Sequence, residues 1–302
     1  MKTFAPDYYK DFKCIAGDCK HSCCIGWEID IDEDTAEYYS GIPGEMGKRL
    51  EKNINREGEC ACFILGENER CPFLNEKGLC DIIINMGEDS LCQICSDHPR
   101  FRNFLEGRTE IGLGLCCEAA AKLVLEKKTP MTLVEIDDDG EEEELFEEEK
   151  KILGLREKYF GIFCDRNLSI EERIEKAIGK EKNEKLFGSF EKWAEVFLDL
   201  ERLDDEWTRI LENIKSSPER PKEYDEISAE QLLCYYTFRH FLNIEDEKTA
   251  ALFIVLCFYM TEKAAEHTSL TEAARLYSSE IEYSDENIDA LIEIIEAESE
   301  VF

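Results

Sequence analysis

The residues of this chain that are best suited to chemistry are its cysteines. Twelve of the fifteen lie between Cys14 and Cys117, in close sets. Thiols at this density either pair as disulfides or hold a soft metal ion or an iron–sulfur cluster. The first set is Cys14, Cys19, Cys23 and Cys24; the second is Cys71, Cys80, Cys92 and Cys95, flanked by Cys60, Cys62, Cys116 and Cys117.

The start of the chain favours metal ligation over disulfides. Residues 1–14 lack the apolar segment of a secretory signal, so we expect a cytoplasmic protein whose thiols stay reduced. Disulfide frameworks are also typical of secreted chains much shorter than this one of 302 residues. A third interpretation, the small buried apolar thiol, suits Cys164, Cys234 and Cys257, which stand singly in apolar helical surroundings.

Spacing leaves the identity of the metal open. Cys92-x2-Cys95 is a short knuckle of the kind that binds zinc, and Cys71 and Cys80 would complete a tetrahedron. The first set, Cys14, Cys19, Cys23 and Cys24, lacks the residue spacing of two zinc knuckles. A 4Fe–4S cluster accepts thiolates from widely separated points of a chain, so both sets are compatible with iron.

The remaining local motifs add little. His21 lies inside the first set and is a candidate ligand, whereas we expect His98 to pack against its neighbours. The C-x3-C-x2-C triplet of radical adenosylmethionine enzymes is missing, because Cys19-x3-Cys23 is followed by Gly26 at the third position. A glycine fingerprint for dinucleotide binding is missing as well.

Charge and hydropathy exclude two classes of partner. The chain has 36 basic and 70 acidic residues, a formal net charge of −34, and such a surface repels nucleic-acid phosphates. The longest apolar run, residues 250–260, is shorter than the roughly 20 residues that a membrane span requires. We therefore expect neither nucleic-acid nor membrane binding, and we expect the apolar run to form a core helix.

The patterning predicts a mainly α protein in two parts. Residues 1–128 form an irregular, cysteine-rich metal or iron–sulfur domain, in which metal ligation supplies the order that a conventional core does not. Residues 129–144 form an acidic linker, and residues 145–302 form an α-helical domain.

Several local elements are predicted within these parts. The pattern turns helical from Thr109, and residues 131–136 form a short strand. Capping boxes at Ser169, Ser228 and Ser269 open three of about seven helices in the second domain.

Several stretches together resemble the flagellin lysine-N-methylase family, which carries a cysteine-rich zinc- or iron-chelating module. In the first part these stretches are FKCIAGDCKHSCCIGWEIDID (12–32), CPFLNEKGLCDI (71–82), LCQICSDHPR (91–100) and a helix around Glu110 and Cys116. In the second part they are DRNLSIEERI (165–174), YYTFRHF (235–241) and RLYSSEIEYSDENIDAL (275–291). The resemblance extends over nearly the whole chain.

This resemblance implies a cytoplasmic enzyme that methylates lysine side chains of flagellin. The implied methyl donor is S-adenosylmethionine, and the implied metal group is an iron–sulfur cluster, of the 4Fe–4S type, with zinc as the alternative. Nine matched ligand positions exceed what one cube needs, so either two centres exist or some of these thiols are structural. The nine are Cys14, Cys19, Cys23, Cys24, Cys71, Cys80, Cys92, Cys95 and Cys116.

The family pattern also suggests residues of the active site. Its members tend to have a basic residue and a histidine where Ser279 and Tyr283 stand here. The matched polar residues that remain are Tyr277, Glu282 and Asn287. We expect Tyr277 and Asn287 to bind the cofactor.

Methyl transfer to lysine requires a neutral amine, and free lysine has a pKa of about 10.4, so the site must remove a proton. We predict Glu282 as the catalytic base and Tyr235 as a second catalytic residue, and we expect either Tyr235 or Tyr236 to line the channel. Arg239 is predicted to bind the carboxylate of the donor through its guanidinium fork.

Two other classes of function remain open. The chain is alternatively a non-enzymatic zinc- or iron-binding protein whose helical domain docks a partner, which would bind metal but not S-adenosylmethionine. It is alternatively a scaffold held by disulfides, which would contain few reactive thiols.

Overall fold

The computed structural model describes residues 1–302 except 59, 141–143, 222 and 301–302. It contains two compact units. The cysteine-rich unit is Lys13–Arg100, and the helical unit combines Met1–Phe12 with Phe101–Phe302. Helix predominates over strand, so the predicted mainly α class is confirmed.

These units differ from the ranges that the sequence predicts. Residues 101–128 belong with the helices rather than with the cysteines. Part of the predicted acidic linker is strand β7 (Leu133–Asp138), so the strand expected near residues 131–136 is confirmed. Residues 141–143 of that linker lie outside the described residues.

The cysteine-rich unit surrounds a small three-stranded sheet. Its order is β2 (Asp30–Ile31), β4 (Ala61–Phe63) and β3 (Ile54–Asn55), with both pairs antiparallel. Its core contains Tyr39, Phe63 and Phe73, and the ring of Phe63 contacts the rings of the other two. The helices are α1 (Glu33–Ser40), α2 (Gly44–Lys52), α3 (Asp81–Met86) and α4 (Gln93–Asp97).

The helical unit contains a four-stranded sheet in the order β5-β6-β1-β7. The added strands are β1 (Lys2–Pro6), β5 (Arg100–Leu105) and β6 (Arg108–Leu113), and β1 runs parallel to β6 and antiparallel to β7. The helix predicted from Thr109 is therefore wrong, since Thr109 lies in β6 and α5 (Glu118–Leu125) begins later. Gly112 lets this sheet pack closely, because a Cβ there would lie 2.3 Å from Cζ of Phe101.

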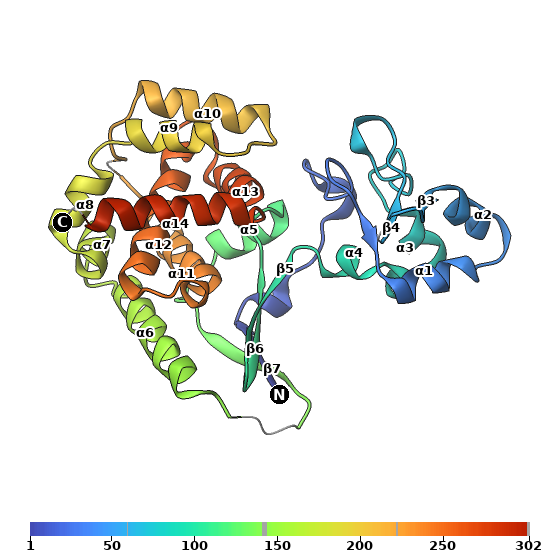
Figure 1. Cartoon of the computed structure of the whole chain (residues 1–302), viewed down its shortest axis with the longest axis horizontal. Helices are drawn as coiled ribbons and strands as arrows, with labels where there is room; N and C mark the ends of the chain where they lie inside the picture. Colours follow the sequence, from blue (N-terminus) through green and yellow to red (C-terminus); the bar gives the residue numbers. More distant parts are fainter. Residues whose placement is uncertain (59, 141–143, 222, 301–302) are drawn as a thin grey trace. The chain divides into compact units, whose positions relative to one another are not determined.

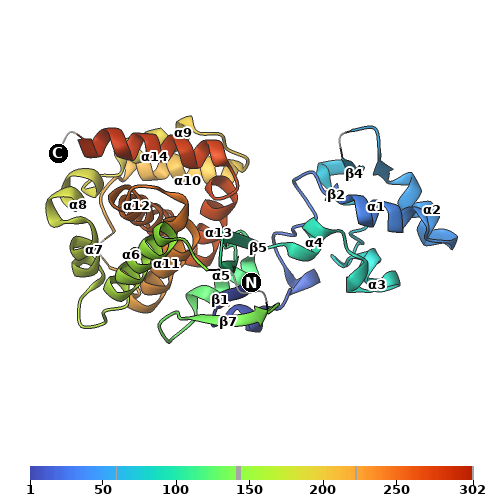
Figure 2. The ribbon, with the colours of Figure 1, turned by 60° about the horizontal axis from the view of Figure 1, so that its bottom comes forward.

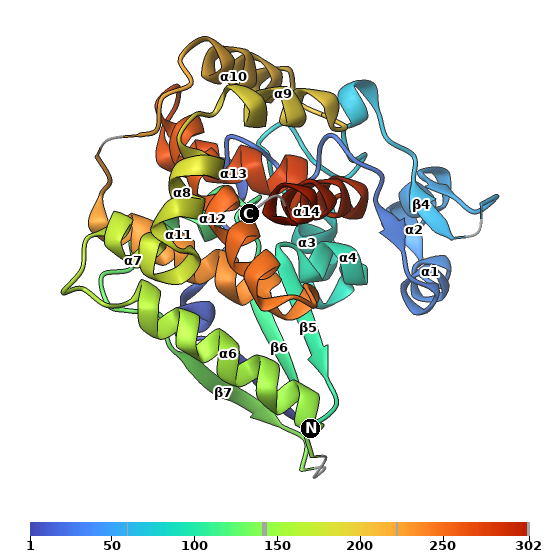
Figure 3. The same ribbon diagram turned by 60° about the vertical axis from the view of Figure 1, so that its left-hand side comes forward.

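Nine further helices follow in the described part of this unit, rather than about seven, because the sequence pattern does not resolve the short helices. Figures 1, 2 and 3 show α9 and α10 lying side by side. The nine are α6 (Glu147–Phe163), α7 (Ile170–Ile178), α8 (Lys180–Phe187), α9 (Glu191–Asp199), α10 (Asp205–Ser216), α11 (Glu226–His240), α12 (Glu247–Ala265), α13 (Leu270–Ile281) and α14 (Asp285–Glu300).

Helix α12 is the central element of the helical unit. It is buried without interruption from Thr249 to Ala264, and it contacts α11, α13 and α14. A helix that is apolar on all sides is stable only when other elements surround it. The core helix predicted for residues 250–260 is confirmed. Within the described ranges, no helix combines the length and apolar character needed to cross a bilayer.

The predicted helix starts are confirmed at two positions. Ser169 and Glu172 form a capping box at α7, and Ser269 accepts a hydrogen bond from the N–H of Glu272 at α13. The prediction for Ser228 is wrong. Asp225 caps α11 instead and accepts from the N–H of Ser228 at 2.9 Å, so Ser228 lies inside the first turn.

Glu262 on α12 gives a first testable prediction. Its side chain is buried, and Oε1 has no hydrogen-bond partner among the described residues. Burial, assisted by Asp225, raises its pKa from 4.5 to about 7. When the pKa of an acid is higher in the native than in the unfolded state, it contributes stability at pH values below its unfolded-state pKa. For Glu262 this stability is lost as the pH rises through about 7.

We therefore expect the free energy of unfolding of Glu262→Gln to exceed that of the wild type by about 3 kcal/mol near pH 9. Near pH 5 we expect the two free energies to differ little. Urea denaturation at both pH values measures this. Glu293→Gln on α14, at an exposed position, serves as the control. Equal stability of the wild type and Glu262→Gln at the alkaline pH would contradict the prediction.

Candidate functional site

The structure separates the cysteines by unit. All fifteen are thiols rather than disulfides, which disfavours the scaffold interpretation. Cys116 and Cys117 lie in the helical unit, as do Cys164, Cys234 and Cys257. The other ten lie in the cysteine-rich unit: Cys14, Cys19, Cys23, Cys24, Cys60, Cys62, Cys71, Cys80, Cys92 and Cys95.

Five of these ten form a thiol cluster, which we define as Cys24, Cys71, Cys80, Cys92 and Cys95. Cys71 and Cys92 are buried in the core of the unit, and the other three pack against that core. Cys95 lies close enough to Cys92, Cys24 and Cys71 for their charges to influence it, and Cys80 is similarly close to Cys24. The cluster therefore draws together both cysteine sets of the sequence.

Backbone contacts bring the segments of the thiol cluster together. The N–H of Cys71 donates to the carbonyl of Cys24 at 2.9 Å, which joins two loops. Asp32 caps α1 through Thr35 at 2.9 Å, and its second oxygen accepts from the N–H of Gln93 at 2.8 Å. One carboxylate thus fixes the start of α4, and with it the Cys92-x2-Cys95 knuckle.

Arg49 holds the segment between Cys71 and Cys80. Its guanidinium donates to Asp81 at 2.6 Å and to the carbonyl of Pro72 at 2.6 Å. It also lies over the ring of Phe73, 5.0 Å from the ring centre. These contacts give a loop of low regularity a fixed conformation.

The donor set of the thiol cluster fits a soft metal, because thiolates bind zinc and iron strongly. A side-chain hydrogen bond with Cys23 lowers the pKa of Cys24 to about 7, whereas burial raises the pKa of Cys71 to about 12. In the parts of the chain that the structure describes, however, no three His, Cys, Asp or Glu side chains lie close enough together to hold a metal ion. The thiols of the cluster therefore suit a soft metal chemically, but the distances between their side chains are not those of a complete coordination shell.

The other predicted ligands of this unit lie outside the cluster. Cys14 and Cys23 are exposed, and the thiol of Cys19 donates to the carbonyl of His21 at 3.2 Å. The metal-binding roles of these residues stay predictions. His98 packs against Trp27, with ring centres 6.4 Å apart, and burial lowers its pKa to about 4, in agreement with the predicted packing role.

A second constellation, the Glu282 network, lies in the helical unit. Glu282 follows the end of α13, and its side chain is fully buried. Tyr235 donates to Oε2 of Glu282 at 2.7 Å, and Nε2 of His240 lies 2.9 Å from Oε1. Nη2 of Arg239 donates to the backbone carbonyl of Glu282 at 2.9 Å. These three partners all come from α11.

The network makes Glu282 a firmly ionised carboxylate. Burial opposes ionisation, but the charge of Arg239 and the hydrogen bond with His240 outweigh it and lower the pKa of Glu282 to about 2. Burial lowers the pKa of His240, so its imidazole is neutral and donates to the carboxylate. A general base works best with a pKa near the operating pH. The base role predicted for Glu282 stays a prediction, and this geometry favours a positioning role.

Arg239 is held with part of its guanidinium unused. Its side chain lies against the ring of Phe101, 4.0 Å from the ring centre, and near the ring of Tyr283. Nη1 is buried and has no hydrogen-bond partner among the described residues. A buried guanidinium nitrogen without a partner is suited to a carboxylate ligand.

Comparisons with known proteins find two proteins named lysine-N-methylase and one protein named for flagellar biosynthesis. Two proteins named lysine-N-methylase, from Salmonella choleraesuis (strain SC-B67) and Salmonella typhimurium (strain LT2), are each 28% identical over 162 residues. A protein named flagellar biosynthetic protein FliU, from Salmonella muenchen, is 28% identical over 139 residues. The chain resembles the flagellin lysine-N-methylase family. The resemblance predicted from the sequence is thereby confirmed.

The match to these lysine-N-methylases is partial. It extends over 50% of this chain and 40% of each of the two lysine-N-methylases, and over 43% of this chain and 80% of FliU. The chain therefore spans less than half the length of the two lysine-N-methylases that it matches. No family model matches the chain, and no solved structure matches it significantly.

The remaining residues predicted from the methylase resemblance occupy different surroundings. Tyr277 is fully buried against the rings of Trp207 and Tyr236. Asn287 uses its amide on the backbone of Glu201, at 3.0 and 3.2 Å, and on the carbonyl of Glu280 at 2.9 Å. Both contribute to packing in the structure, and their cofactor-binding roles stay predictions.

Sequence reasoning missed His240 as a partner of Glu282, and it missed the contacts of Phe101 and Tyr283 with Arg239. Cys116, predicted as a metal ligand, donates its thiol to the hydroxyl of Tyr283 at 3.3 Å, and burial raises the pKa of Cys116 to about 12. Tyr283 and Phe101 enclose Arg239. The signal available for Tyr283 was its place directly after Glu282, where the lysine-N-methylase family tends to have a histidine.

Proposed function

We propose that the chain is an S-adenosylmethionine-dependent methyltransferase that acts on lysine side chains of flagellin and depends on an iron–sulfur cluster. The observation that carries this proposal is the similarity of half the chain to two proteins named lysine-N-methylase. The similarity to FliU, a flagellar biosynthetic protein by name, supports flagellin as the substrate.

The residues of the helical unit suit the donor half of the reaction. In the proposed reaction the methyl–sulfur bond of the donor breaks as the lysine nitrogen forms its new bond to carbon. The unused Nη1 of Arg239 would bind the donor's carboxylate. Glu282 holds Arg239, Tyr235 and His240 in position, so the guanidinium meets the carboxylate without reorganisation.

The residues of the cysteine-rich unit suit the metal group. The thiol cluster supplies five sulfur donors, and Cys14, Cys19 and Cys23 are the other predicted ligands of this unit. Cys116, also a predicted ligand, lies in the helical unit. An iron–sulfur cluster bound there would offer soft Lewis-acid iron or structural cross-linking. Zinc in the same thiols remains the alternative metal.

The test is methyl transfer from radiolabelled S-adenosylmethionine to purified flagellin under anaerobic conditions. We expect label on flagellin lysines that depends on the protein, the donor and the bound metal. Metal-loaded protein that shows no donor binding by calorimetry and no transfer would instead support a non-enzymatic metal-binding protein with a helical docking part. Full activity of a colourless, zinc-only protein would overturn the dependence on an iron–sulfur cluster.

A second prediction concerns the thiol cluster. We expect Cys92→Ser to lose most of the metal that the anaerobically prepared wild type retains, because a buried serine hydroxyl is a poor ligand for soft ions. Iron, sulfide and zinc quantification, with a Mössbauer spectrum, measures this loss. Cys60→Ser, which changes an exposed cysteine outside the predicted ligand set, is expected to keep its metal. Equal metal content in both variants would contradict the assignment.

A further inference from the structure

The helical unit contains a close pair of thiols that the proposed function does not use. Cys164 caps the C-terminal end of α6, and Cys234 lies in α11. Their sulfur atoms are 3.4 Å apart although the residues are separated by 70 positions in the sequence. The expectation that each stands singly among apolar residues is therefore corrected.

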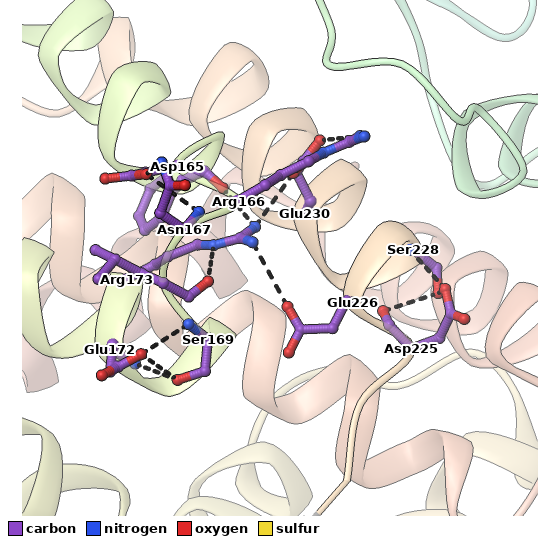
Figure 4. A network of polar contacts seen from close by, with 12 residues as sticks. Asp165, Arg166, Asn167, Ser169, Glu172, Arg173, Asp225, Glu226, Ser228 and Glu230 are labelled. Carbon is purple, nitrogen blue, oxygen red and sulfur yellow. Dashed lines mark hydrogen bonds and ion pairs between the residues drawn. The ribbon is translucent and has the colours of Figure 1, made fainter.

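Charged side chains lie near Cys164, because Glu230, Arg173 and Arg166 all act on its thiol. Figure 4 shows the polar network to which these three side chains belong. Glu230 is buried and accepts from Arg166 at 2.8 and 2.9 Å and from Arg173 at 3.2 Å. Arg173 also approaches Glu226 at 3.5 Å. The hydrogen bond from Cys234 lowers the pKa of Cys164; both guanidinium groups act in the same direction, and burial and Glu230 oppose them.

The two thiols differ in their access to solvent. Cys164 is partly exposed, whereas Cys234 is fully buried. The two guanidinium groups near Cys164 also line a surface cavity of about 320 Å³, together with Ser169 and Glu230. Because Cys164 is the more exposed of the two residues, a small oxidant reaches it before it reaches Cys234, and this is the arrangement of an attacking and a resolving cysteine.

We propose that Cys164 and Cys234 are a modification site that hydrogen peroxide converts into a reversible disulfide between α6 and α11. The Cys164 thiolate attacks one peroxide oxygen, so a sulfur–oxygen bond forms, the oxygen–oxygen bond breaks, and hydroxide leaves and is protonated to water. The Cys234 sulfur then attacks the Cys164 sulfur; the sulfur–sulfur bond forms and hydroxide leaves, taking up the Cys234 proton as a second water. Two thiols and one peroxide give one disulfide and two waters.

The geometry needs only a small adjustment for this bond. The sulfur atoms must approach from 3.4 Å to about 2.0 Å, which small side-chain rotations supply. The bridge would tie the end of α6 to the residue that directly precedes Tyr235 of the Glu282 network. A cross-link over a long loop restricts the unfolded chain, so we expect the oxidised protein to melt at a higher temperature than the reduced protein.

The test uses the full chain, treated with hydrogen peroxide, blocked with N-ethylmaleimide and digested with trypsin. We expect mass spectrometry to find peptide 159–166 cross-linked to peptide 223–239, and dithiothreitol to release both. Recovery of Cys164 as a sulfinic acid, or joined to another cysteine, with Cys234 still alkylated, would overturn the proposal. This readout on the wild type does not depend on the folding of any variant.

Matched variants separate the pair from the other cysteines. Cys164→Ser is expected to lose both the cross-link and the rise in melting temperature. Cys117→Ser, which changes another partly exposed cysteine of the same unit, is expected to keep both. A peroxide-dependent rise of equal size in Cys164→Ser would show that other cysteines cause the stabilisation, and would contradict the assignment.

Discussion

Replacing Glu110 by alanine is expected to destabilise the helical unit by about 3–5 kcal/mol, because it leaves a buried guanidinium without its counter-charge. Glu110 on β6 and Arg156 on α6 are both fully buried. Their side chains form a two-bond pair at 2.6 and 2.7 Å, and Arg108 also pairs with Glu110. The pair joins the sheet to a helix, so its loss affects the packing of both.

The loss is measured as the free energy of unfolding in urea at neutral pH. Glu147→Ala, at an exposed carboxylate near the start of α6, is the control and is expected to change this free energy little. Glu110→Met combined with Arg156→Met is expected to be more stable than Glu110→Ala, because no unpaired charge remains at position 156. A single variant as stable as the wild type would contradict the argument.

The pH dependence of this pair has a definite sign. Burial opposes the ionisation of Glu110, but the hydrogen bonds and charge of Arg156 outweigh it and lower its pKa. When the pKa of an acid is lower in the native than in the unfolded state, it contributes stability at pH values above its unfolded-state pKa. This contribution is lost as the pH falls. The wild type should therefore lose stability in acid more steeply than Glu110→Ala does.

The sequence predicted correctly those elements whose structure depends on interactions between residues close together in the chain. The core helix at residues 250–260 and the caps at Ser169 and Ser269 follow from apolar periodicity and from side chains that bond to nearby backbone groups. Strand β6 was missed in part because one of its two neighbours in the sheet, β1, pairs with it from more than a hundred residues away. Its other neighbour, β5, is separated from it by Glu106 and Gly107 alone, a hairpin spacing that the sequence reasoning did not use.

The candidate sites show the same division. The Cys92-x2-Cys95 knuckle could be read from its spacing, but its neighbour Cys24 could not, because a backbone bond between distant loops places it there. The partners of Glu282 come from α11, more than forty residues away. The resemblance singled out Glu282, and only the structure shows that its two oxygens are already engaged.

The second large effect is expected at Glu282, where alanine should cost about 3–5 kcal/mol of stability because Arg239, His240 and Tyr235 lose a buried partner together. The native pKa of about 2 against an ordinary value of 4.5 corresponds to about 3 kcal/mol of stability at neutral pH. Since the native pKa is depressed, this stability is present above about pH 4.5 and is lost as the pH falls toward 2. Acid unfolding followed by circular dichroism should therefore be less steep in Glu282→Gln than in the wild type.

The same variant distinguishes a positioning role for Glu282 from a base role in the proposed methyl transfer. A positioning carboxylate predicts that Glu282→Gln weakens donor binding and lowers the rate while the pH profile of the rate keeps its shape, because the group that titrates is elsewhere. If Glu282 is instead the base, the limb of the pH–rate profile that reflects its ionisation should disappear in Glu282→Gln. Glu286→Gln, at an exposed position on α14, is the control for both measurements. Unchanged donor binding together with loss of that limb would show that Glu282 takes the proton itself, despite the two hydrogen bonds that hold its oxygens.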